Sequence, residues 1–454
     1  MKRALTDVEL IEISEDDLSD NVDEDFDSGT DEFVSNGSSS DENSEADLDE
    51  NTERVQATSQ GQPVLEDISW DSDSESMNFF PFTKIENFVT PVTGSDPVDY
   101  FMHILTDGFL DEIVTQTNRY AVELFFRPSV TEKARITSWN DVTRDELVIF
   151  LGLLLHMGNI RLNRIQDYWK TDYLFDFQVF AHNMSRNRFL IILKALHFAQ
   201  NPQEGEAASP DHLYKVRSIV NLFNTRMAEI YYPGRELTID KSMVLWRGRL
   251  TFRQYIKNKR HKYGKNLYML TTPGGIVLNV MVCTGMLDDC GGKGHAEKVV
   301  LKLLDGYLGV GHSVFMDKYY NSFKLAKSLA DKQTHCTGPI KSNRKSFPQE
   351  VRNKKLKKGE TVAKYSNGVM IGKWKDKREV WYISNEYKND LRQIQTRRRR
   401  QDVEIKSKPL PIINYNNATA ASPPAPSAIK IRKGVRVGGR DGRETDVDSA
   451  TPPL

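Results

Sequence analysis

Residues 236–325 decide the fold, and an aspartate marks each end of this stretch. It opens with Glu236-Leu-Thr-Ile-Asp240-Lys-Ser-Met-Val-Leu-Trp246, and its last apolar run is Ser313-Val-Phe-Met-Asp317-Lys-Tyr-Tyr320. Two further apolar runs, 267–272 and 276–283, are separated by Pro-Gly-Gly at 273–275, which is a hairpin signal. The pattern predicts a strand, a hairpin, a connection and a last strand, with a carboxylate on the first and last strands.

Two carboxylates at neighbouring strand ends can bind one metal ion. Neighbouring strands lie about 4.8 Å apart, and Mg²⁺ (or Mn²⁺) prefers hard oxygen ligands. Two such ions, about 3.5–4 Å apart, clamp the attacking and leaving oxygens of phosphoryl transfer. A site of that kind usually needs a third acid. The alternative is that Asp240 is a turn residue and Asp317 a solvated surface acid.

Charge is unevenly divided along the chain. The 454 residues carry 62 basic and 63 acidic side chains, for a net charge of −1. Residues 1–76 hold 25 of the acids and only Lys2, Arg3 and Arg54, so the remainder carries +21. A basic body with an acidic arm favours a polyanion partner bound with salt-dependent affinity. The alternative is ordinary solvation spread over the surface.

Composition argues against several classes of protein. Cys283, Cys290 and Cys336 have no paired metal-ligand spacing and do not suggest a secreted disulfide scaffold. No apolar run reaches the roughly 18 residues of a membrane span, and no signal peptide opens the sequence. The glycine-rich segment 291–295 lacks the spacing of a nucleotide-binding loop. We therefore expect a cytosolic or nuclear protein with neither membrane association nor a nucleotide cofactor.

Residues 1–85 are rich in Asp, Glu and Ser and are predicted to form a disordered acidic arm, because few apolar groups offset the entropy of ordering. This arm could solubilise the chain, recruit protein partners, or fold back on the basic body and compete with nucleic acid.

Residues 86–232 are predicted to form a helical domain. Asp96 and Pro97 suit the start of a helix, and Thr143-Arg-Asp-Glu146 is a capping box. The run 147–155 that follows is apolar on every side, which predicts a buried helix. Residues 189–198 and 213–230 also have helical spacing, and Pro233-Gly234 ends the last helix. Such helices could dimerise, hold DNA, or only pack on the sheet.

A basic segment interleaved with aromatic residues follows the first aspartate. Basic side chains that contact phosphates, together with aromatic rings that stack on bases, are typical of DNA binding. A hairpin edge whose basic residues prevent aggregation would look similar. The DNA-binding candidates here are Arg247, Arg249, Arg253, Tyr255, Lys257, Lys259, Arg260, Lys262 and Lys265.

Beyond the second aspartate, residues 341–358 form a basic insertion, where Lys341 and Arg344 are further candidates for DNA contact. Two strands are predicted at 369–375 and 380–384. Residues 386–454 are predicted to be a basic linker followed by a disordered tail. Within the linker, Arg397, Arg398, Arg399 and Arg400 form a nuclear-localisation-like run or a phosphate patch.

In its motifs the chain resembles the piggyBac family of cut-and-paste DNA transposases, over roughly residues 97–416. The resemblance is carried by Leu237-Thr-Ile-Asp240, Arg247-Gly-Arg249, Phe252-Arg-Gln-Tyr255, His261-Lys-Tyr-Gly264, Gly294-His295, Phe315-Met-Asp317-Lys-Tyr-Tyr-Asn-Ser322, Gly338, Ser342-Asn-Arg344 and Trp374-Lys-Asp-Lys-Arg-Glu-Val380. It implies an α/β fold with an RNase H-like catalytic core, here at 233–385, and a DDD active site. The first two acids of that triad map onto Asp240 and Asp317, and the helical domain gains a role in dimerisation or DNA binding.

The third acid of the family pattern is missing. In the family a Tyr-Asn pair leads to a Gly-Gly-Val-Asp motif on a closing helix, whereas here Tyr415-Asn416 leads into Asn-Ala-Thr-Ala-Ala-Ser-Pro-Pro. The family's C-terminal cysteine-rich zinc module is absent too. Asp376 is the substitute candidate for the third acid, although a turn aspartate is the simpler interpretation. Lys318, beside Asp317, departs from the family's usual Asn and would compete with a metal for the carboxylate.

The sequence thus favours a nuclear, double-stranded-DNA-binding protein derived from a piggyBac transposase, able to form a homodimer and catalytically incomplete. Two alternatives remain. One is an active transposase that uses Mg²⁺, with Asp376 as its third acid. The other is an interaction scaffold that recruits partners through its acidic arm.

Overall fold

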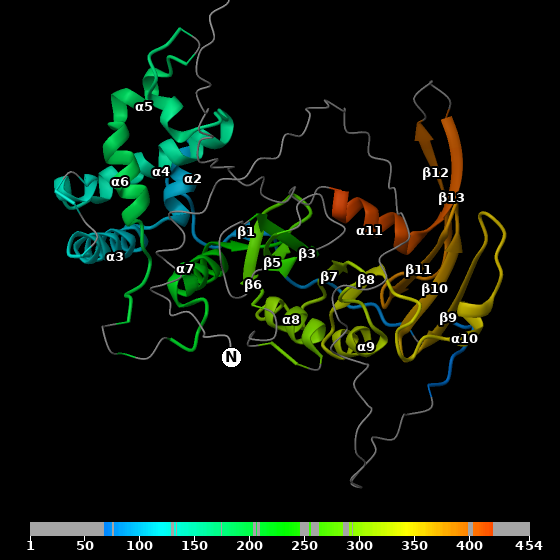
Figure 1. The fold of residues 1–454 in the computed structure, drawn as a ribbon. Helices are drawn as coiled ribbons and strands as arrows, with labels where there is room; N and C mark the ends of the chain where they lie inside the picture. Colours follow the sequence, from blue (N-terminus) through cyan, green and yellow to red (C-terminus); the bar gives the residue numbers. More distant parts are fainter. Residues whose placement is uncertain are drawn as a thin grey trace, which may run out of the picture. The chain divides into compact units, whose positions relative to one another are not determined.

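The computed structural model describes residues 68–74, 77–128, 131–132, 134–173, 175–202, 206, 209–245, 254–255, 263–284, 290–292, 294–397 and 403–420. They belong to two compact units, one around residues 145–193 and a larger one within 37–144 and 194–428. Figure 1 labels the elements of both. Among the described residues, no helix combines the length and apolar character that crossing a membrane requires.

The smaller unit contains α4 (Arg144–Asn159), the 3-10 turn η2 (Ile165–Trp169), α5 (Gln178–Asn183) and α6 (Arg186–Ala195). Aromatic rings in tilted and edge-on contacts fill its core, with Phe180 and Phe189 both contacting Trp169. The expectation that α4 is buried on every side is wrong. Its side toward Leu147 and Phe150 is buried, but Leu155 is 61% exposed, because the unit is too small to cover the whole helix.

The larger unit begins with α2 (Pro97–Ile104), α3 (Asp107–Phe125) and the 3-10 turn η1 (Arg135–Ser138), and its helix α7 (Tyr214–Ile230) leads to the sheet. Asn224 of α7 fastens this helix to an edge strand: its amide group donates to Val280 O (2.9 Å) and accepts from Val280 N (2.8 Å). The helices within 86–232 are therefore divided between the two units.

A nine-stranded mixed sheet dominates the larger unit, in the order β4-β5-β3-β7-β8-β11-β10-β9, with β6 also paired to β5. β3 runs parallel to β7 and β7 parallel to β8, while the other pairs are antiparallel. The predicted strand, hairpin, connection and strand are confirmed as β3, β5–β6 and β7. The bounds are β3 (Glu236–Leu245), β4 (Gln254–Tyr255), β5 (Tyr263–Thr271), β6 (Val277–Val282), β7 (Ser313–Met316), β8 (His335–Pro339), β9 (Thr361–Ser366), β10 (Val369–Lys375) and β11 (Glu379–Ser384).

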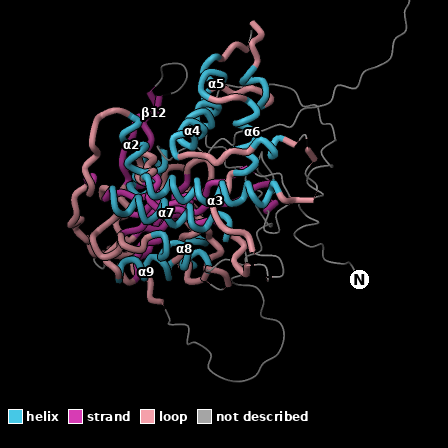
Figure 2. The backbone as a smooth tube through the Cα atoms, turned by 90° about the vertical axis from the view of Figure 1, so that its left-hand side faces the viewer, coloured by secondary structure: helices cyan, strands magenta, loops and turns pink. Residues whose placement is uncertain are grey.

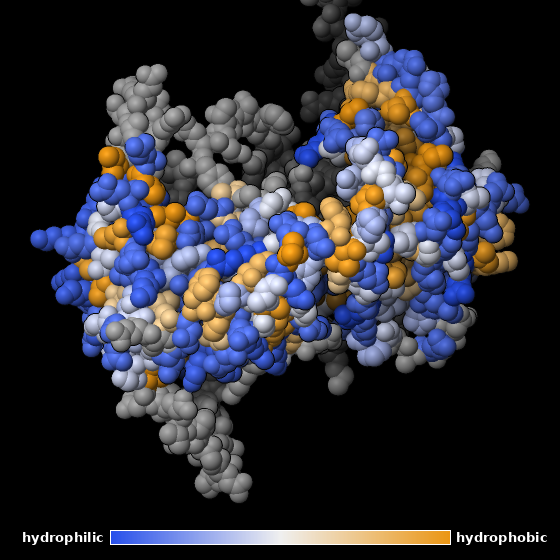
Figure 3. All heavy atoms as spheres, turned by 180° about the vertical axis from the view of Figure 1, so that it is seen from behind, coloured by the Kyte–Doolittle hydropathy of each residue, from blue (hydrophilic) through white to orange (hydrophobic). Residues whose placement is uncertain are grey.

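Helices lie on both sides of the central strands. α8 (His295–Leu303) and α9 (Phe323–Asp331) lie on one side, and α11 (Leu410–Ala420) lies on the other (Figure 1). Figure 2 shows α7, α8 and α9 along the strands from a second direction. The apolar core between α8, α9 and the sheet includes Leu237, Val300 and Leu329, all fully buried. The face seen in Figure 3 is mostly hydrophilic, with scattered hydrophobic areas.

The C-terminal part is more ordered than the predicted linker. β12 (Leu391–Arg397) and β13 (Val403–Pro409) form an antiparallel two-stranded ribbon, and α10 (Gln349–Asn353) interrupts the basic insertion. The β-branched residues Ile394, Thr396, Val403 and Ile405 favour strands, a signal that the charge run concealed. α11 carries the helix past Asn417 to Ala420, and residues 421–454 lie outside the described part.

The assignment of residues 1–85 to a disordered arm is wrong for its last segment, while 1–67 lie outside the described residues. Residues 68–74 and 77–88, which we call the strap, run across the larger unit as the blue segment of Figure 1. Asp71 pairs with Tyr365 of β9, and β1 (Asn87–Phe88) pairs with β2 (Tyr231–Tyr232). Aromatic residues explain the difference, since Trp70 packs on Phe323 at 5.1 Å between ring centroids.

Candidate active site

Asp240 and Asp317 are placed side by side by the parallel pairing of β3 and β7. Leu237 is opposite Val314 and Ile239 opposite Met316, so each aspartate is the next residue along its strand. Asp240 is half-buried within β3, and Asp317 is exposed where β7 ends. The two carboxylates that the sequence singled out therefore share one edge of the sheet.

Each carboxylate of this pair uses one oxygen in a local hydrogen bond. Asp240 Oδ1 accepts from Lys241 N at 2.7 Å, and Asp317 Oδ1 accepts from Lys318 N at 2.6 Å. Within the described residues neither is ion-paired. Lys241 lies over the rings of Tyr268 and Tyr319, at 5.8 and 5.1 Å from their centroids.

The turn after Asp317 is held by several polar contacts. Asn321 donates from Nδ2 to both Met316 O and Pro339 O, at 2.9 Å each, and so joins β7 to β8. A Cβ on Gly338 would lie 2.0 Å from Met316 O, so only glycine allows this close approach. Arg344, a predicted DNA contact, donates to Tyr319 O at 2.6 Å and therefore stabilises the turn.

Two tyrosines lie close enough to the pair to sense its charge. Tyr320 is 1% exposed, and among the described residues its hydroxyl has no hydrogen-bond partner. Burial, then Tyr319, then the Asp240 and Asp317 charges raise its pKa. Burial and the same two carboxylates raise the pKa of Tyr415 on α11. Both phenols stay protonated at neutral pH and can donate hydrogen bonds at the site.

The described part of the chain brings no third acid to the pair. Among the described residues there is no group of three His, Cys, Asp or Glu side chains arranged to hold a metal ion. Asp376 lies in the turn between β10 and β11, and β8 and β11 separate β10 from β7. α11, which lies over the pair, has no Asp or Glu in its sequence.

The predicted DNA-binding residues after Asp240 fall mostly outside the described part of the chain: Arg247, Arg249, Arg253, Lys257, Lys259, Arg260 and Lys262. Tyr255 lies on the short strand β4. Lys265 lies on β5 and is only 7% exposed, so it is not a surface cation. Lys341 is half-buried, Arg397 ends β12, and Arg398–Arg400 are outside the described residues.

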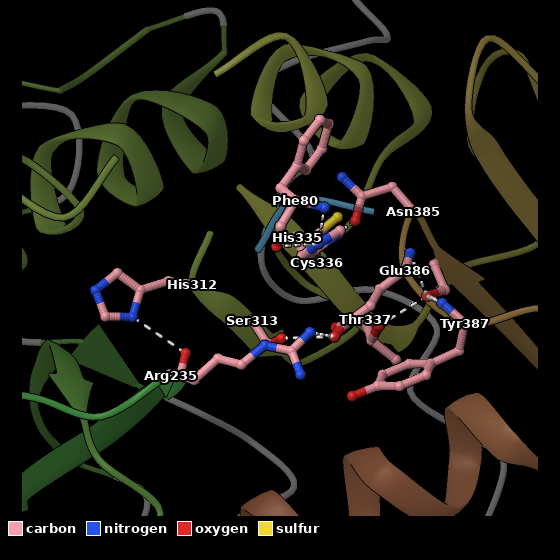
Figure 4. Close-up of polar contacts among 11 residues, drawn as sticks. Phe80, Arg235, His312, Ser313, His335, Cys336, Thr337, Asn385, Glu386 and Tyr387 are labelled. Atoms are coloured by element: carbon pink, nitrogen blue, oxygen red, sulfur yellow. Dashed lines mark hydrogen bonds and ion pairs between the residues drawn. The ribbon is translucent and has the colours of Figure 1, made fainter. Parts of the chain in front are cut away.

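Sequence reasoning missed a second polar cluster, at the other end of the same strands (Figure 4). The Glu386 side chain is 2% exposed and is ion-paired with Arg235. It also accepts a hydrogen bond from Ser313 Oγ at 2.8 Å. These partners lie 151 and 73 residues away, so no local pattern could have revealed them.

Two buried histidines connect this cluster to the strap. His335 Nε2 accepts from Phe80 N at 3.0 Å, and the ring of Phe82 packs at a tilt against His312, with 4.8 Å between the ring centroids. Burial lowers the pKa of both His312 and His335, which keeps them neutral. A Cβ on Gly311 would lie 2.3 Å from Pro81 O, so this end of the sheet is closely covered.

Comparison with known proteins now identifies the family. The sequence model of the Transposase IS4 family matches residues 96–428. The chain belongs to this transposase family, and within it to the piggyBac type. It is 27% identical over 307 residues to human PiggyBac transposable element-derived protein 2, covering 64% of this chain and 48% of that protein. It is 24% identical over 328 residues to human PiggyBac transposable element-derived protein 3, covering 66% and 52%.

A solved structure agrees with this assignment. The fold is similar, with a TM-score of 0.59 and 25% identity, to a piggyBac transposase in a cryo-EM synaptic complex with hairpin DNA, covering 73% of this chain and 67% of that one. The large mixed sheet is thus a transposase-type α/β fold. The chain spans about half the length of the curated human relatives that it matches.

Proposed function

We propose that this chain is a transposase-derived DNA-binding protein whose strand-cleaving chemistry is incomplete. The observation that carries the proposal is the carboxylate pair Asp240 and Asp317 at one edge of parallel strands, without a third acid among the described residues. The pair supports descent from a two-metal nuclease, and the missing ligand supports loss of the reaction.

An RNase H-like core is supported by the strand order. Five neighbouring strands run β6-β5-β3-β7-β8, and the first, fourth and fifth of these in sequence order are mutually parallel. This arrangement is the one that the family resemblance implies for residues 233–385. The acids then lie on the first and fourth strands, and α11 takes the place of the closing helix.

The residues at the pair fit a hard divalent cation, with few protein ligands. Each carboxylate keeps its Oδ2 clear of the local main-chain hydrogen bond, and among the described residues the buried Tyr320 hydroxyl has no hydrogen-bond partner. Mg²⁺ is commonly bound through one or two carboxylates plus substrate phosphates. Asp240 and Asp317 would hold it, and the ion would supply Lewis-acid polarisation of a phosphate. A second ion lacks ligands from the described residues.

DNA is the partner that the charge distribution favours. The chain outside residues 1–76 carries +21, and the structurally similar transposase was solved with hairpin DNA. Binding is proposed to be to duplex DNA, in the nucleus, with the run Arg397–Arg400 as the import signal. Helices α2 to α7 are proposed to contribute to dimerisation or DNA contact, as the family resemblance implies.

DNA binding is tested by fluorescence anisotropy of a labelled duplex with the full chain from 50 to 300 mM salt. We expect the logarithm of affinity to fall linearly with the logarithm of salt concentration, at a slope of about −0.9 for each phosphate neutralised. A flat salt response would refute the DNA-binding function and favour the scaffold alternative.

Catalytic status is tested by Mn²⁺ calorimetry and strand-cleavage assays with short duplex ends, on wild type, Asp240→Asn, Asp317→Asn and Asp376→Asn. We expect weak, single-ion binding that either pair variant abolishes and Asp376→Asn leaves unchanged, with no cleavage. Metal-dependent cleavage that is lost in Asp240→Asn would show an active transposase. If Asp376→Asn also abolished it, that residue would be the third acid.

A further inference from the structure

Three cations of the β12–β13 ribbon share one face. In the antiparallel register, Arg392 is opposite Lys408 and Ile394 is opposite Lys406. Cross-strand partners share a face and alternate along the strand, so Arg392, Lys406 and Lys408 lie on one side, which we call the basic face.

The opposite face of the ribbon carries no charge where its side chains are described. Leu391 is opposite Pro409, Gln393 opposite Ser407, and Gln395 opposite Ile405. Residues 391–409 contain seven basic residues and two acids, Asp402 and Glu404. The ribbon is therefore basic as a whole. Of its cations, Arg392, Lys406 and Lys408 share one side, while nearer the tip the same register aligns Glu404 with that side and Arg397 with the other.

The root of the ribbon is fixed to the sheet, whereas its length is solvated. Asn389 lies just before β12 and is bonded through its amide oxygen to Thr361 (2.9 Å) and to the hydroxyl of Tyr382. Leu410 N donates to Asp390 O at 2.8 Å and closes the base. Farther out, Arg392 and Gln395 are exposed, and Ile405 is 61% exposed. The ribbon extends outward from the sheet in Figure 1.

The position of this root relates the ribbon to the active site. β13 ends at Pro409 and α11 begins at Leu410, so the chain passes without a break from the ribbon into the helix that lies over the carboxylate pair. Tyr415 lies about one and a half turns into that helix, at about 3.6 residues per turn. Burial and the charges of Asp317 and Asp240 raise its pKa. A polyanion on the basic face would be held in fixed relation to the carboxylates.

From this arrangement we propose that the basic face of the β12–β13 ribbon binds the phosphate backbone of the duplex that flanks the carboxylate pair. The inference rests on the proposed DNA-binding function and assigns part of it to one element. Its contacts are to phosphate, because the described side chains of this face are the cations Arg392, Lys406 and Lys408 and the apolar Ile394, which offers no base-reading group. They position the duplex and carry no sequence information.

The test compares two double variants of the full chain by anisotropy with two duplexes of unrelated sequence. Arg392→Gln with Lys408→Gln removes two cations from the basic face. Lys327→Gln with Lys332→Gln removes one cation from α9 and one from the residue that caps its C-terminus, on the other side of the sheet, and is the matched control for net charge. At about 0.15 M salt we expect the ribbon variant to lose roughly 10- to 30-fold in affinity, equally on both duplexes. Its salt slope should become shallower by about 2.

Each outcome of the comparison has a distinct meaning. If wild type binds with a salt slope but the ribbon variant matches the α9 control, the ribbon assignment is wrong and the DNA-binding function stands. If the ribbon variant loses affinity for one duplex only, the ribbon reads bases, and the phosphate proposal is overturned. If wild type shows no salt slope, the DNA-binding function itself fails. Circular dichroism of both variants checks that the fold is retained.

Discussion

The two ends of strands β3 and β7 carry acids in opposite circumstances. At the start of the strands, Glu386 is buried, ion-paired with Arg235 and hydrogen-bonded to Ser313. At their other end, Asp240 and Asp317 have only main-chain hydrogen bonds within the described residues. The first end uses its carboxylate to stabilise the fold, and the second leaves carboxylate oxygens for a ligand.

The covering segments differ in the same way. The strap lies across the Glu386 end, where Phe80 and Phe82 contact His335 and His312. At the aspartate end the cover is α11, which contributes Tyr415 and no acid. The comparison teaches that a charged group in this sheet can be assigned to stability or to ligand binding by counting its protein partners. Burial points the same way, since the Glu386 side chain is 2% exposed whereas Asp240 is half-buried and Asp317 is exposed.

The largest effect should come from removing the ion-pair partner of the buried Glu386 side chain. Arg235→Met leaves Glu386 buried without its countercharge, and we expect the free energy of unfolding to fall by about 3–5 kcal/mol. Urea unfolding followed by circular dichroism measures the change. Lys332→Met, at an exposed position, is the matched control and should stay within about 0.5 kcal/mol of wild type. A small loss for Arg235→Met would mean that the Glu386 end does not depend on its partners.

Removing the strap should have the next largest effect. A chain that begins at residue 68 retains the ring contact of Trp70 with Phe323 and the pairing of Asp71 with Tyr365, whereas one that begins at residue 90 loses both. We expect the first chain to have the melting temperature of the wild type and the second to melt several degrees lower. A loss of about 2 kcal/mol in the free energy of unfolding shifts the melting temperature by roughly 4–8 °C in a unit of this size. Equal melting temperatures would place the strap outside the folded body.

The buried histidines should give the Glu386 end a moderate pH dependence. Burial lowers the pKa of His312 and His335 in the folded chain, so below about pH 6.5 the unfolded chain takes up protons that the folded chain does not. The contribution of the two neutral histidines to the free energy of unfolding is therefore complete above that pH and is lost as the pH drops toward 5. The urea midpoint of wild type should fall more steeply with decreasing pH than that of the double variant His312→Gln with His335→Gln, so the two midpoints should converge at low pH. His197, whose pKa is also lowered, should leave part of the dependence in place.

The sequence was sufficient for features that depend on short-range patterns. The apolar runs around Asp240 and Asp317 and the Pro-Gly-Gly turn define β3, β5, β6 and β7, and helical spacing defines α7. The adjacency of the two acids then follows from a parallel pair of strands in register. Charge runs led to wrong predictions in two places. The basic run at 397–400 led us to expect a linker where β12 and β13 lie, and the acidic composition led us to expect disorder at the strap despite its aromatic residues.

Features built from distant residues could not be predicted from the sequence. Arg235 and Glu386 meet only because β11 pairs with β8 two strands away from β3. Tyr415 reaches the carboxylate pair only through the packing of α11 against β3 and β7. The hydrogen bond from Arg344 to the carbonyl of Tyr319, 25 residues away, was likewise not predicted. In each case the deciding fact is the order of strands or the docking of a helix.

The smallest effect on stability should come from the aspartate end. This small effect is the strictest test of the contrast between the two ends of the sheet. Asp240→Asn and Asp317→Asn keep side-chain shape and the local main-chain hydrogen bonds, remove no ion pair among the described residues, and relieve repulsion between neighbouring carboxylates. We expect each to change the free energy of unfolding by less than about 0.5 kcal/mol, or to raise it by up to about 1 kcal/mol. Both variants should nevertheless lose Mn²⁺ binding, as calorimetry with short duplex ends would show. A loss of stability as large as that of Arg235→Met would mean that the two acids are structural, and the contrast between the two ends of the sheet would fail.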